Sequence, residues 1–244
     1  MTDESPVPPE PQRSDRKVLA PLWHTAVLVF ILLVVALGGS RLQDGPTAGE
    51  AGADHHPVVL PLYFSLIVFE WLLVGFVWFG LRRGGGTPIS DLVGGRWKTG
   101  RDFLIDLGIA AAFWIVWMGV GELVKYLLGP NTAKSVAVLF PRGLFEVGTW
   151  IVLSISAGFC EEVVYRGYLQ RQFLALTGST AAAILIQGVL FGVTHGYQGT
   201  KLVITISVYG VLYGALASWR KSLRPGIISH GWSDIYSGFL ARLF

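Results

Sequence analysis

The sequence predicts an all-α fold, a polytopic bundle of about seven transmembrane helices. Of the 244 residues, 52% are hydrophobic and only 14% are charged, and the mean hydropathy is +0.54. Soluble domains carry about 25% charged residues, so this deficit indicates that lipid surrounds much of the chain. Apolar segments of spanning length recur along the sequence. Because lipid offers backbone groups no hydrogen-bond partners, each segment must be helical where it meets lipid.

Taken in order, these segments fall into three parts of the chain. Residues 1–17 (MTDESPVPPEPQRSDRK) are rich in proline and charge, which predicts a disordered N-terminal tail. Residues 18–143 are expected to form the N-terminal transmembrane helices, and residues 144–244 a core of late helices. The last three spans are short, so we expect them inside the bundle. The predicted spans lie near residues 18–38, 58–81, 103–128, 144–170, 180–196, 201–219 and 226–243.

The first segment, residues 18–38, ends in small residues, as a cleaved signal peptide also does. Its apolar run is nearer the roughly 20 residues of a membrane span than the roughly 7–15 of a signal core. We therefore expect a retained helix in an integral membrane protein, with the lipid bilayer as its surroundings.

Lysine and arginine are unevenly distributed between the two sets of loops. This bias predicts a cytoplasmic N-terminus and, with seven spans, an outward C-terminus. We expect the protein in a bacterial cytoplasmic membrane. The cytoplasmic set is Arg13, Arg16, Lys17, Arg82, Arg83, Arg96, Lys98, Arg101, Arg171, Arg220, Lys221 and Arg224, against Arg41, Lys134, Arg142, Lys201 and Arg242 outside.

The overall charge and the cysteine content exclude other classes of protein. The net charge is +3, and the basic residues are scattered at segment ends rather than concentrated on one face. No nucleic-acid partner is therefore expected. The single cysteine, Cys160, excludes an internal disulfide framework.

Glycines recur every four residues in two of the late segments. Gly188, Gly192 and Gly196 form one stripe, and Gly210 and Gly214 repeat the spacing in the next segment. Small residues at this spacing let helix backbones approach closely in a membrane. We therefore expect the late segments to form the tightly packed core.

The stretch GFCEEVVYR (158–166) places two adjacent carboxylates within an apolar segment. A charge at the bilayer centre costs at least about 2.5–3.5 kcal/mol, unless it is paired, neutralised or in a wet cavity. Arg166 follows Glu162 by four residues, so we expect these two to pair. Glu161, about 100° further around the helix, has no local partner. Alternatively, both glutamates lie at a membrane surface.

Two histidines and an aspartate lie in the late segments. His195 closes FGVTH, whereas His230 and Asp234 are four residues apart in HGWSD and so share a helix face. If the fourth and fifth segments turn near Thr177, Glu161 lies about one turn from His195. The same reasoning places His230 shallower, about 10 Å from the inner end of its helix. His24 in the first segment is expected to be interfacial.

A carboxylate and two imidazoles in a dry pocket suit peptide hydrolysis. This reaction needs a base to deprotonate water and a group that stabilises the oxyanion. Alternatively, the glutamate and histidines hold a divalent metal such as zinc, which activates water directly. The residues leave the cofactor undecided.

The stretches EEVVYR (161–166), FGVTH (191–195) and HGWSD (230–234) resemble, in order and spacing, the motifs EExxxR, FxxxH and HxxxN/D. These are motifs of the CPBP family of intramembrane proteases, which includes the type II CAAX prenyl proteases and bacterial bacteriocin-processing or immunity proteins. The resemblance covers roughly residues 145–240, and it implies that residues 144–244 are a catalytic core with the active site among the C-terminal helices.

The resemblance implies a role for each matching residue. Glu161 would activate water together with His195, and His230 and Asp234 would help to stabilise the oxyanion. Glu162 and Arg166 would support the site. Descriptions of the family differ between a metalloprotease and a glutamate-type protease. Many members have asparagine where this chain has Asp234; an ionised aspartate accepts but does not donate hydrogen bonds, so Asp234 would be protonated, orient His230 or bind a cation.

We therefore expect a membrane hydrolase that cleaves a membrane-associated peptide or protein tail, prenylated or not. A proton- or ion-coupled transporter is the first alternative, because intramembrane acids and histidines also mark proton relays. A non-catalytic scaffold or immunity protein is the second. A Cys160 nucleophile activated by His195 is a further alternative, although apolar surroundings favour an inert thiol.

Overall fold

The structure is a computed structural model that describes residues 18–43, 59–129 and 139–240. The predicted tail, residues 1–17, lies outside the described residues. Within the described ranges every regular element is helical, which confirms the predicted all-α bundle. The elements are α1 (Leu22–Gln43), α3 (Leu60–Arg83), α4 (Ile89–Val93), α5 (Gly100–Leu128), α7 (Leu144–Glu161), η2 (Glu162–Leu169), α8 (Gln170–Thr177), α9 (Thr180–Thr194), η3 (Gly196–Gln198), α10 (Thr200–Arg220) and α11 (Arg224–Leu240).

Each of the seven predicted segments is helical, but fewer than seven helices meet the length and hydropathy of a span. Five described helices do so, namely α1, α3, α5, the continuous unit α7–η2–α8 and α10. The apolar helix α9 is shorter, with 15 residues, and α11 has 17. The shortness of α9 and α11 agrees with the expectation for the last three segments. The expectation is wrong for α10, which has 21 residues, reaches spanning length and has only 22% of its apolar stretch buried.

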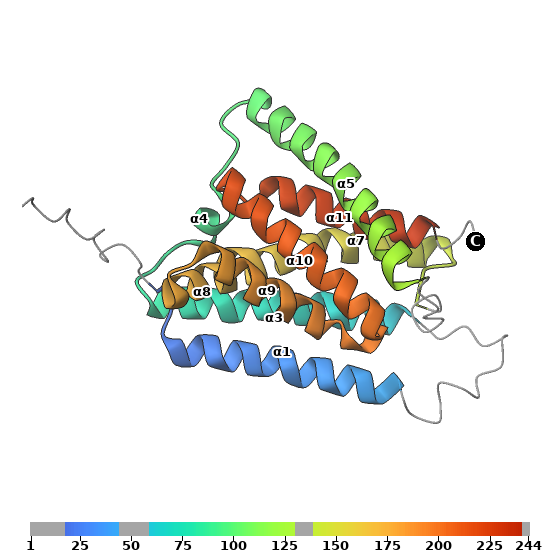
Figure 1. The fold of residues 1–244 in the computed structure, drawn as a ribbon, viewed down its shortest axis with the longest axis horizontal. Coiled ribbons are helices and arrows are strands. Elements are labelled where there is room, and N and C mark those ends of the chain that lie inside the picture. The colour runs from blue at the N-terminus through green and yellow to red at the C-terminus, as the bar shows by residue number, and fades with distance from the viewer. Residues whose placement is uncertain (1–17, 44–58, 130–138, 241–244) are drawn as a thin grey trace, which may run out of the picture.

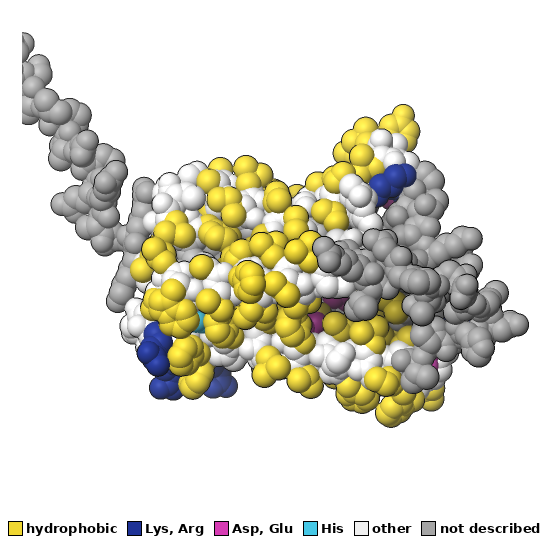
Figure 2. Space-filling view, turned by 90° about the horizontal axis from the view of Figure 1, so that it is seen from below, with side chains coloured by type: hydrophobic (Ala, Val, Ile, Leu, Met, Phe, Trp, Pro, Cys, Tyr) yellow, Lys and Arg dark blue, Asp and Glu magenta, His cyan; other side chains and the backbone are white. Residues whose placement is uncertain are grey.

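The helices form a bundle with α1 and α5 on opposite sides and α7, α9, α10 and α11 between them (Figure 1). Of the five spanning units, α7–η2–α8 is the most buried, and it packs against α3, α9 and α11. Large apolar side chains are exposed on the outside of the bundle. Figure 2 shows this hydrophobic surface, with Lys and Arg side chains gathered towards its ends, as expected of a protein that lies in a membrane.

Glycine contacts set the close approach of the core helices. Gly188 of α9 faces the backbone of α10: a Cβ atom added to it would lie 2.8 Å from the Val211 nitrogen. Similarly, a Cβ on Gly158 of α7 would lie 2.7 Å from the Gly231 nitrogen of α11. The predicted close packing through small residues is therefore present, although Gly196 has open space around its α-carbon and is not part of it.

The segment after Glu161 is a π-helix, where we expected a continuous α-helix. The Gln170 N–H donates to the carbonyl of Tyr165, five residues earlier. All residues from Glu162 to Leu169 are buried. A π-helix turns less per residue than an α-helix, so it changes which side chains of this segment face α11. Such segments occur frequently at functional sites.

The first helix is fastened to the core by a buried histidine. His24 is fully buried, with Nδ1 2.8 Å from the Tyr168 hydroxyl and Nε2 2.8 Å from the carbonyl of Phe76. Its ring stacks on Phe76. The expectation that His24 is interfacial is therefore wrong, because neighbouring helices satisfy both of its nitrogens.

A buried carboxylate fixes α5 against α10 and α11. Asp106 of α5 is fully buried and lies 2.9 Å from guanidinium nitrogens of both Arg220 and Arg224. The indole N–H of Trp97 donates to its second oxygen at 2.8 Å. These ion pairs join the start of α5 to the junction of α10 and α11, the two helices that form one wall of the site described next.

Candidate active site

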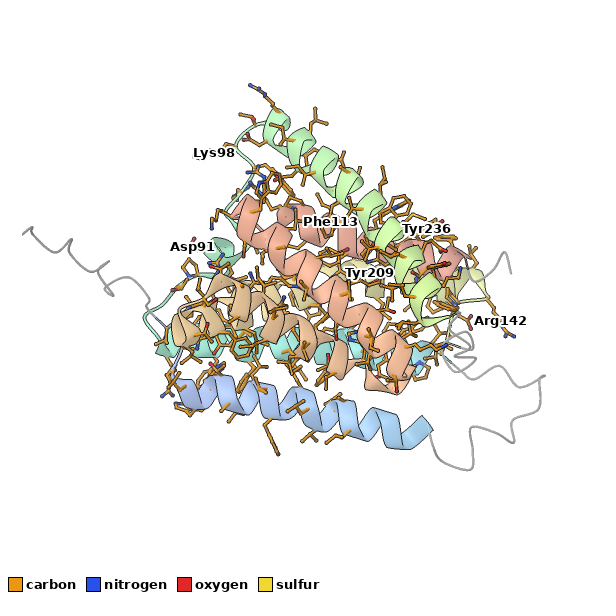
Figure 3. All side chains as sticks on the ribbon, in the orientation of Figure 1. Asp91, Lys98, Phe113, Arg142, Tyr209 and Tyr236 are labelled. Carbon is orange, nitrogen blue, oxygen red and sulfur yellow. The ribbon has the colours of Figure 1, made fainter. Side chains whose placement is uncertain are left out.

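A cavity of about 580 Å³ lies among the late helices and α3. Residues from α3, α7, α9, α10 and α11 line it, so helices distant in sequence meet there. Tyr209, labelled in Figure 3, stacks on Trp117 between α10 and α5, and both residues line the cavity. Four of the residues singled out from the sequence are also in the lining, namely Glu161, His195, His230 and Asp234.

His230 of α11 lies between two adjacent glutamates. Its Nδ1 is 3.1 Å from Oε1 of Glu162, and its Nε2 is 3.5 Å from Oε2 of Glu161. Its ring stacks on Tyr213 with a centroid separation of 5.2 Å. Because carboxylate oxygens accept hydrogen bonds, an N–H on either ring nitrogen has an acceptor in place. The two glutamates thus fix the plane of the ring.

The predicted pair of Glu162 and Arg166 is present and buried. The distance from Arg166 Nη1 to Glu162 Oε1 is 3.1 Å, and the two side chains are 0% and 1% exposed. The guanidinium also lies over the Phe191 ring, 4.3 Å from its centroid. Glu162 therefore has the Arg166 guanidinium of its own helix on one side and the His230 ring of α11 on the other. This arrangement explains how the carboxylate is tolerated away from water.

Glu161 has a partner that its own helix does not provide. Its carboxylate faces Nε2 of His230, and 22% of its side chain is exposed. From the fold-back of α7 and α9 we expected Glu161 about one turn from His195 and His230 at a shallower depth. The direct contact is with His230, because the close α7–α11 packing at Gly158 and Gly231 brings α11 alongside. Glu161 remains open to the cavity, where a water molecule can reach it.

His195 lies at the end of α9, in the wall of the same cavity. Its Nδ1 is 2.8 Å from the carbonyl of Phe191. A backbone carbonyl only accepts, so Nδ1 carries the proton in this hydrogen bond. In the neutral ring Nε2 then has a free lone pair. His195 and Glu161 thus line one space without a direct hydrogen bond between them in the described structure.

Asp234 lies one turn after His230, as the spacing predicts. The distance from His230 Nε2 to Asp234 Oδ2 is 3.8 Å, and 36% of the Asp234 side chain is exposed. This separation is an ion-pair distance rather than a hydrogen bond. The Asp234 carbonyl accepts from the indole N–H of Trp150 at 3.0 Å, which ties this part of α11 to α7.

Glu70 is a cavity residue to which the sequence analysis assigned no role. It lies on α3, in the lining of the cavity, and its Oε2 accepts a hydrogen bond of 2.9 Å from Ser156. Its position in the middle of an apolar segment was the available signal, since an ionisable residue within a span is a candidate functional residue.

Cys160, by contrast, is 1% exposed and belongs to the hydrophobic core rather than to the cavity lining. This placement disfavours a cysteine nucleophile.

The arrangement does not fit a metal ion. Among the residues that the structure describes, no group of three or more His, Cys, Asp or Glu side chains lies so as to hold one. Both ring nitrogens of His230 already face glutamate oxygens, which leaves Nε2 of His195 as the imidazole nitrogen without such a contact.

The fold and this cluster define a polytopic helical membrane protein with an acid–imidazole site enclosed among its late helices. Residues 143–236 match the family model described as type II CAAX prenyl endopeptidase Rce1-like. Over these residues the match confirms the predicted resemblance to the CAAX prenyl proteases. The matched segment begins at the residue that precedes α7 and ends within α11, so it contains every candidate site residue named from the sequence. No curated protein and no solved structure matched the chain.

Proposed function

We propose that the chain is an intramembrane endopeptidase that cleaves a membrane-associated peptide or protein tail with water activated by glutamate and histidine. One observation supports this proposal most directly. His230 lies 3.5 Å from Glu161 and 3.1 Å from Glu162, at a cavity that His195 also lines. A base, a second imidazole and a fixed hydrogen-bond donor are thereby available around one space.

Glu161 is the proposed general base. Its carboxylate takes one proton from a water molecule, while Nε2 of His195 accepts a hydrogen bond from the O–H that stays on the water oxygen. The water oxygen bonds to the scissile carbonyl carbon, and the carbonyl π electrons move to the oxygen. The proton on Glu161 then passes to the amide nitrogen as the carbon–nitrogen bond breaks, which leaves an acid and an amine. General base catalysis of this kind contributes about 10²–10⁴-fold.

His230 is the proposed donor to the oxyanion. Its Nδ1 faces Glu162, which is itself paired with Arg166. This chain of contacts holds the ring in place. In the proposal the ring is an imidazolium, with one N–H on Nδ1 towards Glu162 and the other on Nε2 towards the cavity. A preorganised donor in a site shielded from water contributes more than the same group in water, because nothing has to reorient during the reaction.

Asp234 is proposed to orient His230. The 3.8 Å distance to Nε2 allows electrostatic attraction to a protonated ring. An ionised Asp234 has no hydrogen to give to the oxyanion, so the donor role belongs to His230 alone. Asp234 thus acts as a positioning residue in this proposal.

The substrate is proposed to be a peptide segment that enters from the membrane. The cavity lining combines the acidic and imidazole groups with large apolar and aromatic side chains, among them Trp117, Trp150 and Tyr209. Such a wall suits an extended apolar segment whose scissile carbonyl reaches the polar groups. The apolar lining does not distinguish a prenyl group from apolar side chains of a peptide. Prenylation of the substrate is therefore not part of the proposal.

We also propose that the N-terminus is cytoplasmic and that the protein lies in a bacterial cytoplasmic membrane. The basic residues Arg82 and Arg83 end α3, Arg220 ends α10 and Arg224 begins α11. They lie together at one end of the bundle, which the positive-inside rule assigns to the cytoplasm.

The test is a peptide-library digest with detergent-purified protein after metal analysis. We expect cleavage products from the wild type and none from Glu161→Gln. The control variant Glu122→Gln should give the same products as the wild type. Glu122→Gln is the same substitution at an exposed position on α5, where Glu122 pairs with Lys125 at the surface. It therefore controls for the loss of one negative charge.

Two results, obtained together with two further measurements, would contradict the proposal. If no peptide is cleaved, and vesicles containing the protein show pH-driven ion flux, the chain is a transporter. If a phenotype in cells survives Glu161→Gln unchanged, the cavity is not used for chemistry and the protein is a scaffold or immunity protein.

A further inference from the structure

A second cavity, of about 240 Å³, lies at the end of the bundle where the basic residues gather. Its lining comes from η2, α8, the start of α9, the end of α10 and the turn into α11. Thr180 begins α9 and Lys221 follows the last residue of α10. Helix ends lie at the level of lipid headgroups, so this cavity opens near the membrane surface rather than at the bilayer centre.

The lining of this cavity is basic and contains no acidic residue. Arg166, Arg171 and Lys221 all contribute to it. Arg171 is held in place by the carbonyl of Leu92, which accepts from its Nη2 at 3.0 Å. Thr180, the first residue of α9, also lines the cavity, and a helix N-terminus attracts negative charge. These groups together favour an anion.

Arg166 contributes a buried guanidinium that is not fully satisfied. Its side chain is 0% exposed, and no described group accepts a hydrogen bond from Nε or Nη2. Only Nη1 lies near an acid, 3.1 Å from Glu162 Oε1. A guanidinium has five N–H donors, and leaving them unpaired in a buried place is costly. Because the guanidinium is fully buried, it adds its positive charge beside the cavity and does not itself contact a group bound there.

Lys221 has a backbone conformation unusual for its residue type. Its φ is +56°, the left-handed region, and it is the one residue other than glycine with positive φ in the described chain. Glycine is the residue that adopts this conformation at no steric cost. A lysine at this position gives the cavity rim an exposed ammonium group, which glycine would not.

We propose that this second cavity binds a phosphate group, and that its source is the headgroup of an anionic phospholipid. Apolar side chains such as Leu174, Ala183 and Leu223 lie in the lining beside the cations, which suits the glycerol and first acyl carbons next to a phosphate. Basic pockets between helices on the cytoplasmic side bind such headgroups. Since one water occupies about 30 Å³ in the liquid, the cavity has room for a phosphate and for waters around it.

The test measures lipid retention by native mass spectrometry of the full chain in detergent. Phosphatidylglycerol and phosphatidylcholine are added at equal concentration, and thermal unfolding is followed in parallel. We expect the wild type to retain phosphatidylglycerol selectively and to be stabilised by it. Lys221→Gln should weaken retention about fivefold, the contribution of one basic side chain near a headgroup surface, and Lys221→Glu should weaken it further.

Arg82→Glu is the matched control, because Arg82 lies at the same end of the bundle but outside the cavity lining. It should retain phosphatidylglycerol as the wild type does. All variants are compared for unfolding temperature without lipid, and Lys221 is exposed, so folding should be unaffected. Activity is not part of the readout, so the result does not depend on the proposed function.

The source of the phosphate is decided by adding inorganic phosphate alone. If inorganic phosphate stabilises the wild type but not Lys221→Glu, and phosphatidylglycerol is not selected, the phosphate site is supported but the lipid source is wrong. Equal retention of the two lipids together with no effect of inorganic phosphate would overturn the proposal. So would selective retention that is unchanged in Lys221→Glu. The cavity would then contain only water.

Discussion

Glu162→Gln removes one charge from a buried ion pair without changing the volume of the side chain. The carboxylate lies 3.1 Å from both Arg166 Nη1 and His230 Nδ1. Its side chain is 1% exposed, so water does not replace the lost charge. The guanidinium would then be left in the protein interior without a counterion. Breaking a buried pair in this way costs about 3–5 kcal/mol.

For a chain of this size, such a loss lowers the unfolding temperature by on the order of 10 °C. The assay is thermal unfolding in detergent, followed by the intrinsic fluorescence of the nine tryptophans. Glu122→Gln serves as the control. Its pair with Lys125 is at the surface, with side chains 73% and 59% exposed, and exposed pairs contribute less than about 1 kcal/mol.

A double variant tests the physical reason for the effect. Replacing Arg166 by Met in the Glu162→Gln background removes the unpaired cation as well. Apolar replacement of a buried pair is often neutral or stabilising, so the double variant should regain part of the lost stability. The reasoning is refuted if Glu162→Gln unfolds at the wild-type temperature, or if the two substitutions destabilise additively.

Three further predictions concern the packing and the chemistry of the core. Gly158→Ala should destabilise the protein and reduce cleavage, because the added Cβ would lie 2.7 Å from the Gly231 nitrogen. Gly148→Ala on the same helix is the control: its added Cβ has no neighbour within 4 Å, so unfolding temperature and cleavage should not change. Asp106→Asn should lower the unfolding temperature, since it leaves two arginines without their buried counterion. Equal unfolding temperatures would show that this cluster does not hold α5 against α10 and α11. Cys160→Ser should keep its cleavage activity in the peptide digest, and loss of cleavage in a variant that still folds would restore the cysteine alternative.

The local features of the fold were predictable from the sequence because they depend on neighbours along the chain. Apolar runs identified all seven helical segments, since backbone groups in lipid must be paired within the helix. The pairing of Glu162 and Arg166 followed from their four-residue spacing. Glycine spacing likewise predicted where helices approach closely, as at Gly188.

Partners from distant helices were not predictable in the same way. Glu161 was expected about one turn from His195, with His230 at a shallower depth, but Glu161 contacts His230 directly. The reason is that depth and rotation of one helix against another depend on particular contacts, here the α7–α11 approach at Gly158, and not on hydrophobic periodicity. The π-helix after Glu161 adds to this, because it changes the rotation that α-helical spacing assumes.

The sequence by itself determined that this chain is a helical membrane protein whose late segments contain paired carboxylates and histidines. Composition and spacing suffice for this, since lipid imposes helices and penalises unpartnered charge. Only the tertiary structure decided which of these groups face one another and that Glu70 lines the cavity. It also showed that Asp106 holds α5 against α11 and that His24 holds α1 against η2. Those outcomes depend on side-chain contacts between segments far apart in the chain, and these contacts form only when the helices pack.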